Sequence, residues 1–429
     1  MSVLALGFVA SLAIGVPVAL AMGASAILYL LIRTDIPLAV VAQRLFTGTD
    51  NFVLIALPLF ILAGNLMTVG RLSELLVEFV HALVGHFRGG LAQVNTVQSM
   101  IFGGISGSAV ADIAAEGPVL LPMMRKDGYD MAFASAVTAA TACMGPIIPP
   151  SIPLVIYGIV SGSSIGALFL AGAFPGTLIG LIIMVYNYLV VPRYHHPPPG
   201  RAQARFSPVR LARTSKTALL VLLLPAIILG GIIGGVFTPT EAAGVAAAYA
   251  FVIAFFVLRT LGLRDLPAIL LDTAVLTSAV MLIVAMASVF SWIIAVERVP
   301  AAVAEYFQRV SGSPEVFLGL VIVLLLFFGT FLEPTSAIII LTPVLLPVAT
   351  RLGIDPVHFG AVMVIGMVIG LITPPVGLCL FVVCALTRVP FEAVSRACLP
   401  YVVLMVGVLI LVAYVPPLTL WLPRMLLGP

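Results

Sequence analysis

The chain has 429 residues, of which 62% are hydrophobic and 9% are charged. Soluble domains carry about 25% charged residues, so this composition excludes a soluble globular protein and predicts an all-α protein that crosses a membrane many times. The formal net charge of +3 is small, so the positions of the charged residues are more informative than their sum.

The chain begins with apolar segments separated by short polar connections. Residues 3–32 are apolar but interrupted at Gly15-Val16-Pro17, which fits either two short spans or one tilted helix. After a polar connection at 33–50, residues 52–69 are predicted to span the membrane. Residues 71–86 carry apolar side chains at helical spacing, which suits a helix lying in the membrane interface.

Two unusual apolar segments follow. Residues 89–124 contain two arms that meet at residues 103–108, and neither arm is long enough to cross a bilayer alone, so we predict a re-entrant helical hairpin. Residues 131–161 contain the adjacent prolines Pro149 and Pro150. Proline lacks an N–H and breaks a helix, and unpaired backbone groups are costly in hydrocarbon. We therefore predict a discontinuous helix whose break lines a polar cavity or is sealed within protein.

A short amphipathic piece at 163–174, a span at 172–191 and a polar linker at 193–216 complete the first half. The linker carries six basic residues and no acid, so the positive-inside rule predicts a cytoplasmic location. A nucleic-acid-binding role for this basic run is less favoured, because basic loops beside membrane spans are common.

The second half repeats the order of the first. Its predicted elements are spans at 217–234, 241–258 and 272–296, an interfacial helix at 300–310, a second hairpin at 316–349 with its tip at 329–336, a second discontinuous helix at 358–386 containing Pro374-Pro375, and a last span at 399–420.

The two halves are related by a shift of 225 positions. Between Gly117–Pro150 and Thr342–Pro375, 13 of 34 residues are identical without a gap, and the double prolines are aligned. Paired broken helices in two halves are the sequence indication of a secondary transporter with its site at the repeat interface. We therefore predict two structural repeats, residues 1–192 and 217–429.

The charges predict that these repeats are inverted. With the linker in the cytoplasm, counting outward places Arg88 and Arg125 inside and Arg351 and Asp355 outside. The hairpins then enter the membrane from opposite faces, so one central site can be approached from both sides.

The hairpin tips offer groups that suit a small cation and a carboxylate. Helix C-terminal carbonyls favour cations, and helix N-terminal amides favour anions. Neither hairpin nor discontinuous helix contains Lys or Arg, so an anionic substrate would depend on helix ends, hydroxyl groups and bound cations. The alternative is that the small residues at the tips only allow close helix packing. The hydroxyl residues at the tips and breaks are Ser106, Ser108, Thr330, Thr335, Ser336 and Thr373.

Three acids lie near the tips, and acids within the membrane are candidates for function. Asp112 and Glu116 are one helical turn apart and share a face. Glu333 precedes a proline, so it is either a ligand or the N-cap of the following half-helix. Glu241, three residues after Thr238, is predicted to belong to a helix N-terminal cap.

An enzyme is the competing class of function. Residues 104–107 match the GxSG sequence of rhomboid-type intramembrane proteases. A serine nucleophile needs a histidine base within hydrogen-bond reach, but His358 begins a span on the predicted opposite face, and the other histidines lie in interfacial or loop segments. The four cysteines lie in apolar runs without CxxC spacing, so no transition-metal site is expected. We therefore predict a transporter and not an enzyme.

The chain resembles the large membrane subunit of tripartite ATP-independent periplasmic (TRAP) transporters, the DctM type of the ion transporter superfamily. The segments that carry the resemblance extend over nearly the whole chain. They are FGGISGSAVADIAAEGPVLLPMM, KDGYDMAFASAVTAATACMGPIIPPSIPLVIYG, FTPTEAAGVAAAYA, FLEPTSAIIILTPVLLP and GLITPPVGLCLFVV.

The resemblance implies an elevator-type importer with a scaffold and a mobile transport domain. It implies coupling to Na⁺ as the co-transported ion, with no organic cofactor, and a small organic acid as cargo, either a C4-dicarboxylate or a sugar acid. The implied partners are a small four-helix DctQ-type membrane subunit and a periplasmic DctP-type binding protein, in the inner membrane of a bacterium. The alternative within transport is a stand-alone sodium-coupled dicarboxylate or citrate symporter.

The resemblance also implies two sodium sites. One would involve Ser106, Gly107, Ser108 and Gly145, and the other Gly329, Thr330, Gly370 and Thr373; Gly104 and Glu333 at the tips complete the candidate sodium ligands. The substrate is expected between the tips and the breaks. The candidate substrate-binding residues are Ser108, Asp112, Pro149, Pro150, Ser151, Thr335, Ser336, Pro374 and Pro375.

Overall fold

The computed structural model describes residues 2–32, 36–196, 206–302, 305 and 313–428. Within these residues the secondary structure is helical, apart from an isolated β-bridge between Tyr129 and His195. Seven of the described helices are long and apolar enough to cross a membrane, so the chain is a helical membrane protein with several spans. These seven are Phe52–Val69, Ile165–Arg193, Pro208–Ile233, Pro239–Val257, Leu266–Val296, Pro334–Arg351 and Phe391–Tyr414.

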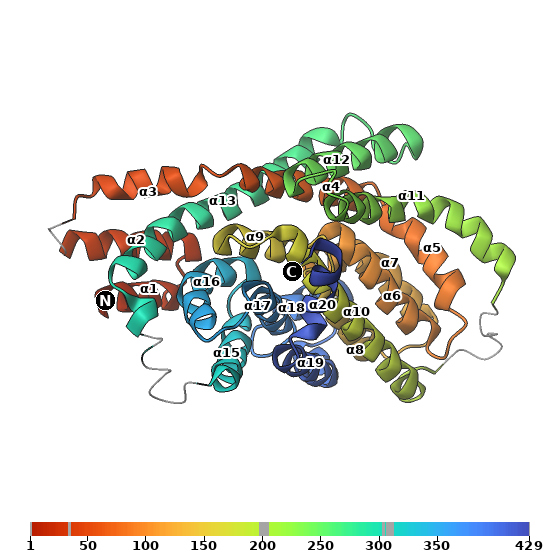
Figure 1. The fold of residues 1–429 in the computed structure, drawn as a ribbon. Helices are drawn as coiled ribbons and strands as arrows, with labels where there is room; N and C mark the ends of the chain where they lie inside the picture. Colours follow the sequence, from red (N-terminus) through yellow and green to blue (C-terminus); the bar gives the residue numbers. More distant parts are fainter. Residues whose placement is uncertain (1, 33–35, 197–205, 303–304, 306–312, 429) are drawn as a thin grey trace.

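The helices form two groups, which Figure 1 shows as a long layer lying along one side of a denser bundle. The first group, here called the outer layer, is held together by contacts of α4 with α12 and of α13 with α2, α3 and α4. Its helices are α1 (Ser2–Ala13), α2 (Val18–Ile32), α3 (Ala39–Thr49), α4 (Ala56–Val69), α5 (Leu72–Val84), α11 (Pro208–Ile233), α12 (Pro239–Val252) and α13 (Leu266–Val296).

The second group, here called the inner bundle, contains the hairpins and the broken helices. Several of its helices begin at a side-chain cap, such as Asp130, which accepts a hydrogen bond from Phe133 N at 2.9 Å. Its helices are α6 (Gly90–Ser106), α7 (Ala109–Lys126), α8 (Met131–Ala142), α9 (Ile152–Ser161), α10 (Ile165–Val190), α15 (Pro314–Gly329), α16 (Pro334–Arg351), α17 (Pro356–Gly370), α18 (Leu378–Thr387), α19 (Phe391–Tyr414) and α20 (Pro417–Leu427).

Two helix pairs and two interrupted helices organise the inner bundle. The end of α6 and its turn into α7 form the first tip, residues 106–108. The end of α15, the connection and the start of α16 form the second tip, residues 329–336. The first break, residues 143–151, separates α8 from α9, and the second break, residues 371–377, separates α17 from α18. Each break contains one cis proline–proline bond.

Short local bonds satisfy the backbone inside the breaks. In the first break, the amides of Gly145 and Ile147 donate to carbonyls three residues earlier, and the Ser151 hydroxyl donates to the Pro146 carbonyl. In the second, the Thr373 hydroxyl donates to the Ile369 carbonyl at 2.8 Å. Each bond supplies a partner that the interrupted helix has lost, which is required of backbone held away from water.

The two halves pack in a matched way. Helix α7 lies against α18 while α16 lies against α9, so each hairpin contacts the far half of the other broken helix. The Cys143 thiol donates to the carbonyl of Val368 across 3.6 Å. These two residues are separated by the 225 positions that relate the halves, so equivalent positions of the two halves meet beside the breaks.

Several element boundaries differ from those that the sequence predicts. The linker loop predicted as far as residue 216 is wrong beyond Ser207, because Ser207 caps α11 and Pro208 occupies its first turn. The Thr214 and Ser215 hydroxyls then bond to carbonyls four residues earlier, which lets a polar sequence continue as helix. Residues 197–205 of the linker lie outside the described residues.

Other differences between the predicted and the observed helix boundaries also occur at short polar or amphipathic stretches. The polar connection at 33–50 contains α3, and the pieces at 163–174 and 172–191 form the single helix α10. The last predicted span starts too late, since α19 begins at Phe391 and a separate helix α20 follows it. The apolar stretch 3–32 forms two helices, and most of the interfacial helix predicted at 300–310 lies outside the described residues. The cap at Glu241 is confirmed as a capping box with Thr238.

The contact between Gly329 and Gly370 generates a stability prediction. A Cβ on Gly370 would overlap the backbone of Gly329, whereas a Cβ on Gly407 of α19 would meet nothing within 4 Å. We expect Gly370→Ala to lower the free energy of unfolding by about 1–3 kcal/mol through overpacking. Gly407→Ala should be neutral or slightly stabilising. Thermal unfolding of the purified protein in detergent measures both, and equal unfolding temperatures for the two variants would contradict the close contact between Gly329 and Gly370.

Candidate functional site

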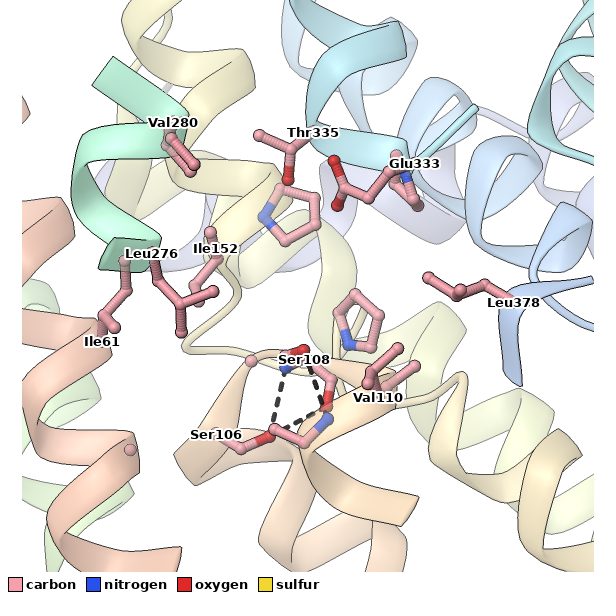
Figure 2. A pocket seen from close by; sticks show the side chains of 18 of the residues that line it. Ile61, Ser106, Ser108, Val110, Ile152, Leu276, Val280, Glu333, Thr335 and Leu378 are labelled. Carbon is pink, nitrogen blue, oxygen red and sulfur yellow. Dashed lines mark hydrogen bonds between the residues drawn. The ribbon is translucent and has the colours of Figure 1, made fainter. Parts of the chain in front are cut away.

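A cavity of about 510 Å³ lies where the inner bundle meets the outer layer. Both tips line it, together with residues at or beside both breaks and side chains from α4 and α13. Its volume falls within the range of about 300–1,000 Å³ that is usual for small-molecule sites. Figure 2 shows Ser106 and Ser108 of the first tip across this cavity from Thr335 and Glu333 of the second.

The first tip is tightly folded onto the first break. Gly107 has a φ of +63°, in the left-handed region that favours glycine. A Cβ there would lie 3.1 Å from the Pro150 carbonyl oxygen and 3.0 Å from the Ile152 amide, so the position also requires a small residue. The Ser108 side chain caps α7 by accepting a hydrogen bond from Ala111 N at 3.5 Å.

Ser106 joins the tip to a buried acid. Its hydroxyl donates to Asp112 Oδ1, and its oxygen accepts a hydrogen bond from Ser108 N at 3.1 Å. Asp112 is fully buried, and its Oδ2 has no hydrogen-bond partner among the described residues. Oδ2 instead lies against the Cα of Gly145, behind the cavity wall. Asp112 therefore supports the tip through Ser106 and is not part of the wall.

Glu116 belongs to a polar network still deeper in the bundle. It accepts a hydrogen bond from the Ser99 hydroxyl at 2.7 Å, and Ser99 lies 3.2 Å from the Thr141 hydroxyl. Thr141 in turn donates to Asn95 Oδ1 at 2.8 Å. A buried ionised carboxylate without a counter-charge is costly, so hydroxyl and amide partners are needed here.

The second tip has the same layout with different side chains. Glu333 caps α16 by accepting a hydrogen bond from Ser336 N at 3.1 Å, and its side chain is exposed to the cavity. Glu333 therefore both caps α16 and lines the cavity. Thr330 donates to the Phe327 carbonyl at 2.8 Å, and Gly329 contacts Gly370 of α17 backbone to backbone.

The electrostatics of the cavity come mainly from helix ends. Glu333 is its one acidic lining residue in the described chain, and no Lys, Arg or His lines it there. Helices α7, α9 and α16 begin at or beside the cavity, and their N-terminal amides favour anions. The carbonyl end of α6 and the Glu333 carboxylate favour cations, so the cavity can accommodate both charges at short separation.

Only some of the predicted sodium-binding and substrate-binding residues line the cavity. Ser106, Gly107, Ser108, Glu333, Thr335 and Ser336 line it. The predicted sodium ligands Gly104, Gly145, Gly329, Thr330, Gly370 and Thr373 lie outside this lining, at or near the contacts between tips and breaks.

Several predicted substrate contacts lie away from the wall. Asp112, Pro149, Pro150, Ser151, Pro374 and Pro375 are not among the lining residues. Ser151 is buried, and its hydroxyl is committed to Pro146 while it caps α9. Beside the first break the cavity is lined instead by Pro146 and Ile152.

Sequence reasoning missed the contribution of the outer layer. Asn65 of α4 lines the cavity and donates to Thr273 of α13 at 2.9 Å. The amide side chain of Asn65 inside the apolar segment 52–69 could have indicated this contribution, because polar residues in spans tend to be functional. Leu276 and Val280 of α13 also line the cavity, but apolar residues within an apolar span carry no such signal.

The described residues do not form a serine–histidine pair at the GxSG sequence. Ser106 is bonded to Asp112 and Ser108. His358 has its ring nitrogens near the Thr419 hydroxyl at 2.8 Å and the Ala413 carbonyl at 3.2 Å. A nucleophile activated by histidine is therefore not assembled at this serine.

Comparison with known proteins places the chain in a family. The family model "Tripartite ATP-independent periplasmic transporter, DctM component" matches residues 5–418. The sialic acid TRAP transporter large permease protein SiaM of Vibrio cholerae is 42% identical over 98% of both chains. The C4-dicarboxylate TRAP transporter large permease protein DctM of Pseudomonas aeruginosa is 42% identical over 94% of both chains.

A solved structure supports the fold alone. The YdaH transporter of Alcanivorax borkumensis matches with a TM-score of 0.61 and 16% identity, covering 91% of this chain and 89% of that one. The curated relatives are permease subunits, which agrees with a chain that is not an enzyme. The chain belongs to the DctM family of large permease subunits of tripartite ATP-independent periplasmic transporters.

Proposed function

We propose that the chain is the membrane transport subunit of a TRAP transporter that imports a small organic acid together with sodium ions. The observation that carries the proposal is the meeting of both tips with residues at both breaks around one cavity. Such meeting points of broken helices bind substrate and coupling ions in secondary transporters. Relatives named for sialic acid and for C4-dicarboxylates support an organic acid as cargo.

Sodium would bind at the contacts between each tip and its neighbouring break. The first site would use oxygens of Ser106, Gly107, Ser108 and Gly145, near the carbonyl end of α6. The second would use oxygens of Gly329, Thr330, Gly370 and Thr373, with Gly104 and Glu333 as further tip candidates. Close backbone approach at Gly370 and a buried acid behind Ser106 support this assignment. Bound sodium would supply the positive charge that the side chains of the cavity lack.

The two halves would be inverted repeats, and α6–α7 and α15–α16 would be re-entrant hairpins. The matched packing of α7 on α18 and α16 on α9 supports this symmetry. The inner bundle would move against the outer layer as an elevator, carrying the tips and the bound substrate. Because α4 and α13 contribute one side of the cavity, such a movement would separate the substrate from that side.

Transport would require two partners in the inner membrane and periplasm of a bacterium. Membership of the TRAP family implies a small membrane subunit and a periplasmic binding protein. The DctQ-type subunit would be the membrane partner, and the DctP-type protein would deliver the organic acid.

Reconstitution tests the proposal. Proteoliposomes containing the chain and its small subunit, with the binding protein added outside, are assayed with radiolabelled succinate, N-acetylneuraminate and 3-phenylpropionate. We expect at least one acid to accumulate when a sodium gradient and the binding protein are both present. Accumulation that is unchanged in sodium-free buffer contradicts the coupling, accumulation without the binding protein favours a stand-alone symporter, and no accumulation of any acid contradicts the proposed cargo.

A serine substitution tests the first sodium site. Ser106→Ala removes a hydroxyl that would bind sodium and leaves Asp112 without its hydrogen-bond donor. We expect the sodium concentration that gives half-maximal uptake to rise about tenfold, because such losses amount to about 1–3 kcal/mol. Ser215→Ala, which removes a hydroxyl from α11 in the outer layer, is the matched control. Equal sodium dependence in the two variants would refute the site.

A further inference from the structure

The cavity at the tips has two chemically different parts. Most of its polar side chains lie at the tips, in Ser106, Ser108, Glu333, Thr335 and Ser336, and Asn65 of α4 lies apart from them. Apolar residues, both large and small, form most of the rest of the wall. In Figure 2, Ile61, Leu276 and Val280 lie along one side, and Leu378 lies on the opposite side.

Most of the polar side chains at the tips already take part in hydrogen bonds within the protein. Ser108 and Glu333 cap helices, and Ser106 is bonded to Asp112. The Thr335 and Ser336 hydroxyls also donate to the Glu333 carboxylate. The groups left for a ligand are the hydroxyl hydrogen of Ser108, helix N-terminal amides and any bound cation. Because these groups are concentrated at the tips, they suit one carboxylate at one end of a molecule.

The wall away from the tips offers almost nothing to a second polar group. Among the described residues, the outer layer contributes one polar side chain to the lining, that of Asn65, and its amide nitrogen already donates to Thr273 at 2.9 Å. A second carboxylate, or the hydroxyl groups of a sugar acid, would lose water against Leu276, Val280 and Ile283 without a partner. Burying polar groups in this way is costly, whereas an apolar body gains from the same contact.

We propose that the substrate is a monocarboxylate with an apolar body, and that Leu276 and Val280 of α13 select that body. The inference rests on the proposed transport function and narrows its cargo. The proposed cargo differs from sialic acid and C4-dicarboxylates, for which two relatives of equal identity, 42%, are named. The tips hold the carboxylate, and α4 and α13 hold the rest of the molecule.

Direct binding to the membrane complex tests this inference without the selectivity of the binding protein. The chain with its small subunit is titrated in detergent and sodium chloride with 3-phenylpropionate, succinate and N-acetylneuraminate, and ligand-dependent thermal stabilisation gives each Kd. We expect 3-phenylpropionate to bind about tenfold or more tightly than either polar acid. Equal or tighter binding of a polar acid overturns the proposal, and so does stabilisation by none of the three.

Substitutions in α13 test the selecting residues. Val280→Thr keeps the shape of the side chain and adds a hydroxyl, so it should weaken 3-phenylpropionate binding about fivefold and reduce its advantage over succinate. Leu276→Asn should act in the same direction. Leu282→Asn is the control, because Leu282 is an exposed residue of α13 outside the cavity lining. An unchanged preference in both cavity variants overturns the role of α13.

The two proposals fail separately. If uptake of succinate or N-acetylneuraminate is sodium-dependent and these acids also bind more tightly, the transport function stands and the apolar substrate class is wrong. If no acid is taken up with sodium, the transport proposal itself is wrong.

Discussion

The structure depends on the requirement that backbone groups held away from water find hydrogen-bond partners. Four interruptions of helices lie within the inner bundle, two at tips and two at breaks. Each would be costly in hydrocarbon, and each is accommodated by local turns, side-chain caps and contact with another interruption. The hydroxyls of Ser151 and Thr373 replace helix bonds in the two breaks, and Gly329 and Gly370 let the second tip approach its neighbouring helix.

The same interruptions of helices produce the partial charges that surround the site. An interrupted helix leaves amides at one end and carbonyls at the other, so tips and breaks that meet provide partial charges of both signs without charged side chains. The cavity can therefore suit an anion and a cation together, although no Lys, Arg or His is among the lining residues in the part of the chain that the structure describes. The outer layer adds an apolar side from α4 and α13, so the chemistry of the cavity changes from the tips to the opposite wall.

The sequence predicts the two broken helices well, because adjacent prolines interrupt a helix. The shift of 225 positions then identifies the same interruption in both halves. The sequence predicts the two tips from the short apolar arms that meet at residues 103–108 and from the same register of 225 positions. It places Pro149, Pro150 and Ser151 at the substrate, whereas the folded first break turns them away from the cavity wall and presents Ile152. It misses the start of α11 because serine and threonine side chains can bond to their own helix, and it misses Leu276 because only tertiary packing distinguishes one apolar residue of α13 from another.

We propose that one site between the two tips holds both the organic acid and its coupling ions. The most direct measurement is a cryo-electron microscopy map of the chain with its small subunit, in sodium chloride and saturating transported acid. We expect ligand density between residues 106–108 and 333–336, with the carboxylate of the ligand toward the tips and ion density beside Gly145 and Gly370. Ligand density elsewhere, with the space between the tips empty, would contradict the account.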